Sequence, residues 1–409
     1  MANPLKGTKM TIISRFVIRG LAGRRLPVSH QLHPYVNVLW GLNGSGKTTL
    51  LKILHSALKN DAMGLEALPF DSAQIEFRDN EGRVSIRTFS QVKADPALNE
   101  MRYRVVEDGE GNEYYESILE GPERPGEWET SPSPLPDRLF GANGGYPHTF
   151  LSVNRILETR STERPFGTTK AQLDRPFDSR FAKHIEDAWM RYSNRSNRNG
   201  REIQQQGLAS VLSILFGDAL STNQALSVKE LTALPDARAA YVLVQDFLRS
   251  QGYSVKLDRR VFTRKYDTSI EHRLVTAEIQ AIQARLDALN APQLELESLV
   301  SGLYVGAKTI HFNPGRYDRE RAISVEVEGQ KVPLASLSAG EKQLLYILLE
   351  TMAASGVVMV DEPEISLHPD WQMRLIRSMQ RVNSNAQIIL ASHSPEIVSR
   401  VPRESVIEI

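Results

Sequence analysis

The stretch that decides the fold is GLNGSGKTT at residues 41–49, which matches the phosphate-binding pattern G-x-x-x-x-G-K-[ST]. The apolar run YVNVLW precedes it and LLKIL follows it, so the sequence predicts a strand, a glycine-rich loop and a helix in that order. Glycines let successive backbone N–H groups turn toward one anion, and the following helix adds its positive N-terminus. The stretch therefore predicts a nucleotide-binding loop.

Two side chains of this loop carry chemistry that the backbone cannot supply. Lys47 offers a cation for the β- and γ-phosphates of a nucleotide, and the Thr48 hydroxyl can ligate Mg²⁺. The alternative is a chance occurrence of the pattern, which the flanking strand and helix signals disfavour. The residues expected to contact the nucleotide are Asn43, Gly44, Ser45, Gly46, Lys47, Thr48 and Thr49.

A second signal is GVVMVDEP at residues 356–363, where an apolar run ends in two carboxylates. Such a run is typical of a fully buried strand, and ligands of α/β folds lie at the carboxyl ends of the strands. Asp361 is predicted to hold Mg²⁺, and Glu362 to take the proton of an attacking water. The alternative is an apolar strand that ends in a capped acidic turn, and the phosphate-binding loop in the same chain argues against it.

A third signal is LSAGEKQ at residues 337–343, directly before an apolar helix pattern. Ser338 is a good N-cap, and Glu341 three residues later completes a capping box. That structural interpretation holds in any case. The functional one adds that this helix N-terminus is a second anion site.

A fourth signal is IILASHSP at residues 388–395, another buried-strand pattern, which ends near a histidine. A lone histidine at a strand end is more often structural. His393, however, lies 31 residues after Glu362, one crossover helix and one strand later. A right-handed β-α-β connection would bring it beside the same phosphates, where a neutral imidazole could sense the γ-phosphate and orient Glu362 and the water.

These four motifs, in their order along the chain, resemble those of ABC-type ATPase heads. GLNGSGKTT is similar to the Walker A motif, LSAGEKQ to the signature, VVMVDEP to the Walker B motif, and LASHSP to the strand of the switch histidine. The segment EISLHP at residues 364–369 resembles the D-loop of the OLD, RecF and SMC-like branch rather than that of transporters. The 291 residues between Lys47 and Ser338 also exceed what a transporter ATPase needs.

The resemblance implies an α/β fold in which a head, with a mixed β core and an antiparallel β subdomain, is interrupted by a large, mostly helical insert. It implies ATP and Mg²⁺ as ligands. It also implies that Ser338, Gly340 and Glu341 belong to a signature helix that faces the nucleotide of another head, so that ATP bridges a homo-oligomer. The family has a glutamine that ligates magnesium. Its position corresponds here either to Gln91 or to the equivalent loop at 152–155, and the loop is favoured.

The chain is expected to divide into an N-terminal part of the head at 1–153, a helical insert at 154–304 and a C-terminal part of the head at 305–409. Strand patterns occur at 11–40 and 72–105, and a helix is expected at 237–249. An apolar stripe runs along a second helical segment from Val275 to Leu286, over too few heptads for a long coiled-coil arm. Asn290-Ala291-Pro292 is expected to interrupt that helix.

The insert contains RYSNRSNRNGR, in which Arg191, Arg195, Arg198 and Arg201 occur without an acidic residue between them. One interpretation is a flexible arm that binds nucleic-acid phosphates. The other, which we favour, is a solvated, disordered loop.

Composition excludes several classes of protein. The 409 residues are 41% hydrophobic and 24% charged, which is ordinary for a globular protein. The absence of cysteine excludes disulfides and cysteine metal sites and favours a reducing cytoplasm. Forty-nine basic residues balance forty-nine acidic ones, so a protein that coats nucleic acid with its whole surface is not expected. No signal peptide or membrane-spanning pattern is visible, and no membrane partner is expected.

Three function classes compete. The first is an ATP-driven conformational or assembly switch in bacterial anti-phage defence or DNA maintenance. Its effector is expected on a separate chain, such as a TOPRIM-like nuclease, since only 16 residues follow His393. The ATPase subunit of PARIS-type defence systems is similar in architecture.

The second class is a DNA-repair ATPase of RecF or SMC type that acts directly on DNA. The third is an ATP-binding scaffold or sensor with little turnover. A transporter ATPase is disfavoured by the D-loop form and the insert.

Overall fold

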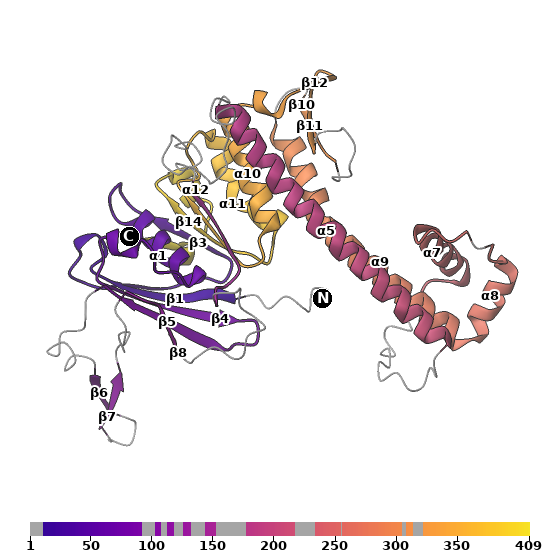
Figure 1. Cartoon of the computed structure of the whole chain (residues 1–409), viewed down its shortest axis with the longest axis horizontal. Coiled ribbons are helices and arrows are strands. Elements are labelled where there is room, and N and C mark those ends of the chain that lie inside the picture. The colour runs from indigo at the N-terminus through magenta and orange to yellow at the C-terminus, as the bar shows by residue number, and fades with distance from the viewer. Residues whose placement is uncertain are drawn as a thin grey trace. The chain divides into compact units, whose positions relative to one another are not determined.

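Figure 1 shows the computed structural model of the chain. It describes residues 11–91, 103–107, 113–117, 126–131, 144–152, 177–216, 234–254, 256–304, 308–313 and 322–409. Contacts divide the chain into two compact units. Among the described residues, the helical unit comprises those of Met190–Leu294, and the head unit comprises those of Leu5–Trp189, Glu295–Asn313 and Arg321–Ile409. The expected boundaries at 153/154 and 304/305 both involve residues outside the described ranges.

A five-stranded parallel sheet forms the centre of the head unit, with the strand order β15-β3-β14-β13-β9. The core strands carry apolar residues on both faces and are buried throughout, as expected of parallel strands covered on both sides. The strands are β3 (Val36–Trp40), β9 (His148–Ser152), β13 (Val357–Asp361), β14 (Gln387–Ser392) and β15 (Val406–Glu408). The predicted buried strands at both ends of the chain are therefore neighbours in one sheet.

Gln387, at the start of β14, is fully buried and bonds to backbone groups outside its own sheet. Its Oε1 accepts from the Ile13 N–H at 2.9 Å, and its Nε2 donates to the Ile13 and His33 carbonyls at 2.8 and 3.0 Å. All three bonds reach segments more than 350 residues away in sequence. The amide therefore ties the C-terminal half of the sheet to the N-terminal part of the chain.

A second sheet of the head unit is antiparallel, with the order β2-β1-β4-β5-β8. Its strands are β1 (Thr11–Arg19), β2 (Val28–Gln31), β4 (Ser72–Asp79), β5 (Val84–Ser90) and β8 (Glu129–Ser131). Helix α1 (Lys47–Lys59) packs against both sheets, and its buried leucines join one hydrophobic core with apolar residues of the two. The mixed β core with an antiparallel β subdomain, predicted from the sequence, is confirmed.

The remaining elements of the head unit come from both its N-terminal and its C-terminal part. Helices α10 (Ala339–Ala353) and α11 (Pro369–Val382) pack together, and the short α12 (Pro395–Val398) follows β14. A bend at Ser355-Gly356 separates α10 from the buried strand β13. The smaller strands are β6 (Tyr103–Glu107), β7 (Glu113–Ser117), β10 (Lys308–Phe312), β11 (Ile323–Val327) and β12 (Gln330–Val332). The 3-10 turns are η1 (Leu21–Gly23), η2 (Leu65–Ala67), η4 (Leu334–Ser336) and η5 (Arg403–Ser405).

Two long helices run through the insert, α5 (Phe177–Phe216) and α9 (Ile270–Leu303). They pack closely, since a Cβ added at Gly207 would lie 2.4 Å from the Ile282 side chain. At 1.5 Å per residue, 40 and 34 residues span about 60 and 50 Å. The sequence pattern therefore underestimated the length of this helix, because the apolar stripe marked only part of α9.

Two expectations for the insert are wrong. Pro292 lies inside α9 and does not end it. Proline lacks a backbone N–H and therefore removes one hydrogen bond of the helix. Buried residues on its C-terminal side, such as Leu296 and Val300, stabilise the helix beyond that point. The arginine run at 191–201 lies within α5 and is neither a disordered loop nor a flexible arm.

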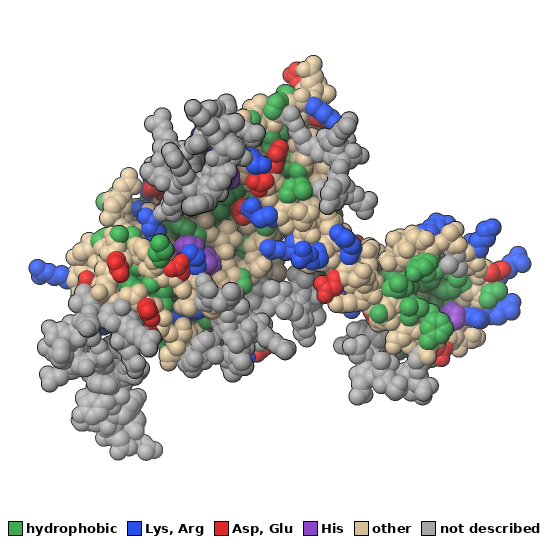
Figure 2. Space-filling view, in the orientation of Figure 1, with side chains coloured by type: hydrophobic (Ala, Val, Ile, Leu, Met, Phe, Trp, Pro, Cys, Tyr) green, Lys and Arg blue, Asp and Glu red, His purple; other side chains and the backbone are tan. Residues whose placement is uncertain are grey.

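The helical unit closes over a small core of its own, to which α7 (Ala237–Ser250) and α8 (Arg259–Thr268) contribute Val244, Phe247 and Phe262. The helix expected at 237–249 is confirmed. Figure 2 shows hydrophobic side chains at the surface over α7 and α8. Among the described helices, none combines the length and the apolar character that a bilayer crossing requires.

Arg87 is buried where β5, α1 and the segment before β9 meet, and only 1% of it is exposed. Its guanidinium donates to the Ala57 and Gly144 carbonyls and to Thr130 Oγ1, and it lies over the Tyr146 ring at 4.6 Å. Burial lowers the pKa of this guanidinium to about 10, which still leaves it charged at neutral pH. Arg87 therefore joins α1 to the antiparallel sheet.

We expect Arg87→Met to lower the free energy of unfolding by about 1–3 kcal/mol, because two buried carbonyls lose their donor. Denaturant titration followed by circular dichroism measures the change. Arg83→Met is the matched control, since Arg83 pairs with Asp79 at the surface, where water screens the pair, and its loss should cost clearly less. Equal midpoints for the two variants would contradict the proposed role.

Candidate functional site

A cavity of about 200 Å³ lies at the carboxyl edge of the parallel sheet. It is lined by Ala22, Asn43, Gly44, Gly46, Lys47, Thr48, Thr49, Pro69 and Glu362. Six of these are among the seven loop residues expected from the sequence, and Glu362 comes from the far end of the chain. Ala22, which follows β1, and Pro69, which precedes β4, were missed because they lie outside the motifs.

The loop conformation depends on glycine. Gly44 and Gly46 have φ values of +81° and +102°, which side-chain-bearing residues rarely adopt. The seventh expected residue, Ser45, has a buried hydroxyl oxygen without a hydrogen-bond partner in the described structure. An orphaned hydroxyl inside a glycine-rich loop fits an anion that is to be bound there.

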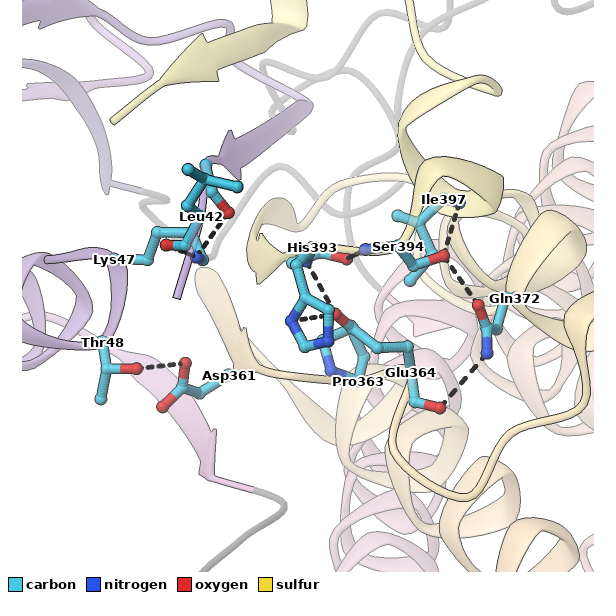
Figure 3. Close-up of polar contacts among 12 residues, drawn as sticks. Leu42, Lys47, Thr48, Asp361, Pro363, Glu364, Gln372, His393, Ser394 and Ile397 are labelled. Carbon is cyan, nitrogen blue, oxygen red and sulfur yellow. Dashed lines mark hydrogen bonds and ion pairs between the residues drawn. The ribbon is translucent and has the colours of Figure 1, made fainter. Parts of the chain in front are cut away.

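Lys47, the first residue of α1, is folded back onto the loop (Figure 3). Its Nζ donates to the Gly41 and Leu42 carbonyls at 2.8 and 2.9 Å, and the residue is 6% exposed. Burial lowers the pKa of Lys47, and the carboxylates of Glu362, Glu364 and Asp361 act against this shift. The ammonium group is thus held on the glycine-rich loop, where it can supply a positive charge for phosphate.

Thr48 and Asp361 meet across the site, with Thr48 Oγ1 donating to Asp361 Oδ1 at 3.0 Å (Figure 3). Asp361 ends β13 and is 4% exposed. Burial raises the pKa of its carboxyl to about 6, and Glu362 and Glu364 add to the rise. A buried carboxylate hydrogen-bonded to a hydroxyl fits Mg²⁺, which takes one or two protein oxygens and fills its shell with phosphate and water. Correspondingly, the described residues hold no cage of three or more His, Cys, Asp or Glu side chains.

Glu362 follows Asp361 directly and lines the cavity beside Lys47 and Thr48. Its φ is +52°, an uncommon value for a residue with a side chain. Its N–H donates to the Ala391 carbonyl of the neighbouring strand at 2.9 Å. This turn of the backbone brings the carboxylate expected to act as base to the wall of the cavity, and such strain is common at functional sites.

His393 follows β14, and its partner is Glu364 (Figure 3). Glu364 Oε1 accepts from the His393 N–H at 2.8 Å and lies 3.1 Å from Nδ1 of the ring. The imidazole is 43% exposed, whereas the Glu364 side chain is 7% exposed. The sequence analysis had His393 act on Glu362 and did not single out Glu364. The only signal for Glu364 was its place as the third acidic residue in DEPE.

The predicted capping box at the start of α10 is present. Ser338 Oγ accepts from the Glu341 N–H at 3.2 Å, Glu341 Oε2 accepts from the Ser338 N–H at 2.8 Å, and Lys308 pairs with Glu341 Oε1. Burial acts against ionisation of Glu341, but hydrogen bonds from Lys308 and Ser338 outweigh it and lower the pKa. Gly340 is required, because a Cβ there would lie 2.4 Å from the Ser366 carbonyl oxygen.

The signature residues do not line the cavity of their own chain. Ser338 is exposed, and Gly340 lies against the segment 364–369. The structure therefore brings Lys47, Thr48, Asp361 and Glu362 together, and it places Ser338 and Gly340 elsewhere in the head unit.

Of the two positions for the missing glutamine, Gln91 has its Nε2 engaged with the Leu65 and Leu68 carbonyls at 2.8 and 3.1 Å. The alternative loop begins at Ser152, which lies directly beside Asp361 in the β9–β13 register. Residues 153–155 lie outside the described ranges.

Residues 127–399, which are 273 of the 409, match the family described as “AAA domain, putative AbiEii toxin, Type IV TA system”. “Retron Ec83 probable ATPase” of Escherichia coli is 25% identical over 147 residues, 29% of this chain and 27% of that protein. “Septu protein PtuA” of Bacillus thuringiensis is 26% identical over 92 residues, 19% of this chain and 23% of that protein. The matched segments thus cover less than a third of either relative.

A solved structure, the Smc head domain with an extended coiled coil from Pyrococcus furiosus, aligns over 98% of this chain and 96% of that chain. Its TM-score is 0.40, and the sequence identity is 14%.

We expect Asp361→Asn to stabilise the protein in the absence of nucleotide and Mg²⁺. The folded-state pKa of about 6 lies above the ordinary 3.8, so folding loses stability as the pH rises from about 4 to about 6 and stays lower above that. The loss amounts to at most about 3 kcal/mol at pH 8. Denaturant midpoints with EDTA at pH 5 and pH 8 should show a gain that grows with pH.

Asp370→Asn is the matched control, because the Asp370 side chain is 64% exposed. A gain for Asp361→Asn that stays constant between pH 5 and pH 8 would show that burial of its charge is not the cause.

Proposed function

The chain belongs to the AAA-domain family that matches two thirds of it, and from this membership and the cavity geometry we propose that it is an ATPase that uses Mg²⁺. The observation that carries the proposal is the convergence of Lys47, Thr48, Asp361 and Glu362 from both ends of the sequence on one cavity. A cation, a hydroxyl and two carboxylates around a glycine-rich loop form the donor set that phosphoryl transfer from ATP needs.

In the proposed reaction, the loop N–H groups and Lys47 hold the phosphates. Thr48 and Asp361 would hold Mg²⁺, which when bound offsets the negative charge of the phosphate oxygens. Glu362 orients a water for in-line attack on the γ-phosphorus and accepts its proton, while His393 contacts the γ-phosphate. Catalysis then consists mainly of positioning and charge stabilisation.

The signature helix is proposed to act on the nucleotide of a second copy. Ser338 is exposed at the N-terminus of α10, outside the cavity of its own chain. A helix N-terminus attracts phosphate, so two chains facing each other could each complete the other's site. ATP would then favour the closed pair, and hydrolysis would release it.

For the biological role, we propose a switch in bacterial anti-phage defence that controls a separately encoded effector, such as a TOPRIM-like nuclease. Support comes from the relatives, which include an ATPase of a retron and the PtuA protein of Septu. A PARIS-type system stays a prediction.

We expect Glu362→Gln to retain ATP binding, to lower turnover by about 100-fold or more, and to accumulate the closed assembly. Phosphate release measures turnover, and light scattering with and without ATP, and with the product of the neighbouring gene, measures assembly. Glu404→Gln, at an exposed position, is the control. Turnover within twofold of the wild type would remove Glu362 from the role of base.

A mixing experiment tests the shared site. Lys47→Ala should abolish ATP binding and Ser338→Arg should block the signature, so each variant alone should be inactive. In a mixed pair, one of the two sites combines an intact loop with an intact signature, and we expect up to about a quarter of wild-type activity from random mixing. A mixture as inactive as its components, although it assembles, would place each complete site within a single chain.

A further inference from the structure

The environment of Glu364 differs from that of an ordinary surface ion pair. The residue is 8% exposed. In the sequence it lies three positions after Asp361 and is separated from Glu362 by Pro363. Its Oε1 accepts from the His393 backbone N–H and faces Nδ1 of the same residue, at 2.8 and 3.1 Å. One carboxylate oxygen thus fixes both the backbone and the ring of His393.

The second oxygen of the same carboxylate, Oε2, is buried and has no hydrogen-bond partner among the described residues. Leaving a buried charged oxygen unpaired is costly, so a residue selected for stability alone would be expected to satisfy both oxygens. The arrangement stabilises one orientation of the His393 ring and leaves the carboxylate itself only half satisfied. This imbalance points to a role for the pair in the site.

The Glu364 backbone is held as well. Gln372 of α11 donates from Nε2 to the Leu367 carbonyl at 2.9 Å and to the Glu364 carbonyl at 3.3 Å. Its Oε1 accepts from Ser394 Oγ at 2.7 Å, next to His393 in the sequence (Figure 3). The segment that carries Glu364 and the segment that carries His393 are therefore joined at two points, by the Glu364–His393 contact and by Gln372.

We propose that Glu364 is the positioning residue of His393. In this arrangement Glu364 Oε1, 3.1 Å from Nδ1, keeps the proton of the neutral imidazole on Nδ1, so that the bare Nε2 faces outward. The hydrogen bond of one ring nitrogen sets the tautomer of the other. Because 43% of the imidazole is exposed, Nε2 is available to accept a hydrogen bond from the attacking water beside the γ-phosphate. The proposal rests on the ATPase function proposed above and deepens it.

A double-mutant cycle tests the proposal through turnover. Glu364→Leu keeps a side chain of similar size but removes both acceptor oxygens, and we expect kcat to fall about 10-fold or more with KM for ATP within twofold. In a His393→Ala background, the same change should lower kcat by less than twofold further, because Glu364 acts through the ring. Equal factors in both backgrounds, or no effect in the first, would overturn the proposal.

A second measurement needs no turnover. Nitrogen-15 labelling of histidine reports which ring nitrogen carries the proton, and His393→Gln assigns the signal. At a pH where the ring is neutral, we expect the Nδ1–H form in the wild type, although Nε2–H is the commoner tautomer of free histidine. An Nε2–H signal would overturn the proposal even if Glu364 variants fail to fold.

The two arms separate the failures. If the wild type does not hydrolyse ATP, the proposed function fails and the tautomer still decides the positioning claim. If it hydrolyses ATP and the Nδ1–H form is absent, only the positioning claim fails. Glu404→Gln should leave both kcat and the His393 signal unchanged.

Discussion

The site depends on the register of the parallel strands. Trp40 pairs with Ser392, Ala391 with Asp361, and Asp361 with Ser152, so four strands end at one edge. In strands buried on both faces, a one-residue slip exchanges apolar residues for apolar residues, and alternation of polarity specifies the register only weakly. Gln387 supplies what alternation cannot, because its three hydrogen bonds to Ile13 and His33 are available in one register only. A slip would leave a buried amide unpaired, at a cost of about 1–3 kcal/mol per lost partner.

At the ends of these strands, charged side chains lie in a buried region where little water can solvate them. Asp361 and Glu364 are buried within four residues of each other, and Lys47 is the cation facing them. Its Nζ, however, is occupied by the Gly41 and Leu42 carbonyls. The orphaned oxygens of Ser45 and Glu364 lie in the two segments that flank this arrangement. A fold selected for stability alone would neutralise these groups. The site therefore lowers the stability of the ligand-free chain.

The sequence predicted the elements whose signal is local. The loop at 41–49, the buried strands, the antiparallel strands and the capping box at Ser338 each follow from a pattern within a few residues, and all are present. What failed depends on distant packing. Pro292 is tolerated because residues on its C-terminal side are buried, and the arginine run is helical because α5 packs on α9. Glu364 was missed for a similar reason, since nothing near it in sequence shows that His393 will lie beside it.

The contacts of Gly340 and Glu364 connect the two ends of the proposed mechanism. The backbone of the segment 364–369 meets Gly340 through the Ser366 carbonyl, and Gln343 of α10 donates to the Pro363 carbonyl at 2.8 Å. The same segment holds His393 through Glu364 and Ser394 through Gln372. A rigid, hydrogen-bonded segment thus touches both the start of the signature helix and the residue proposed to contact the γ-phosphate. Close packing transmits small displacements because it leaves no space to absorb them. A shift of His393 of a few tenths of an ångström on loss of the γ-phosphate would therefore be felt at Gly340, where the backbone approach leaves no room even for a methyl group.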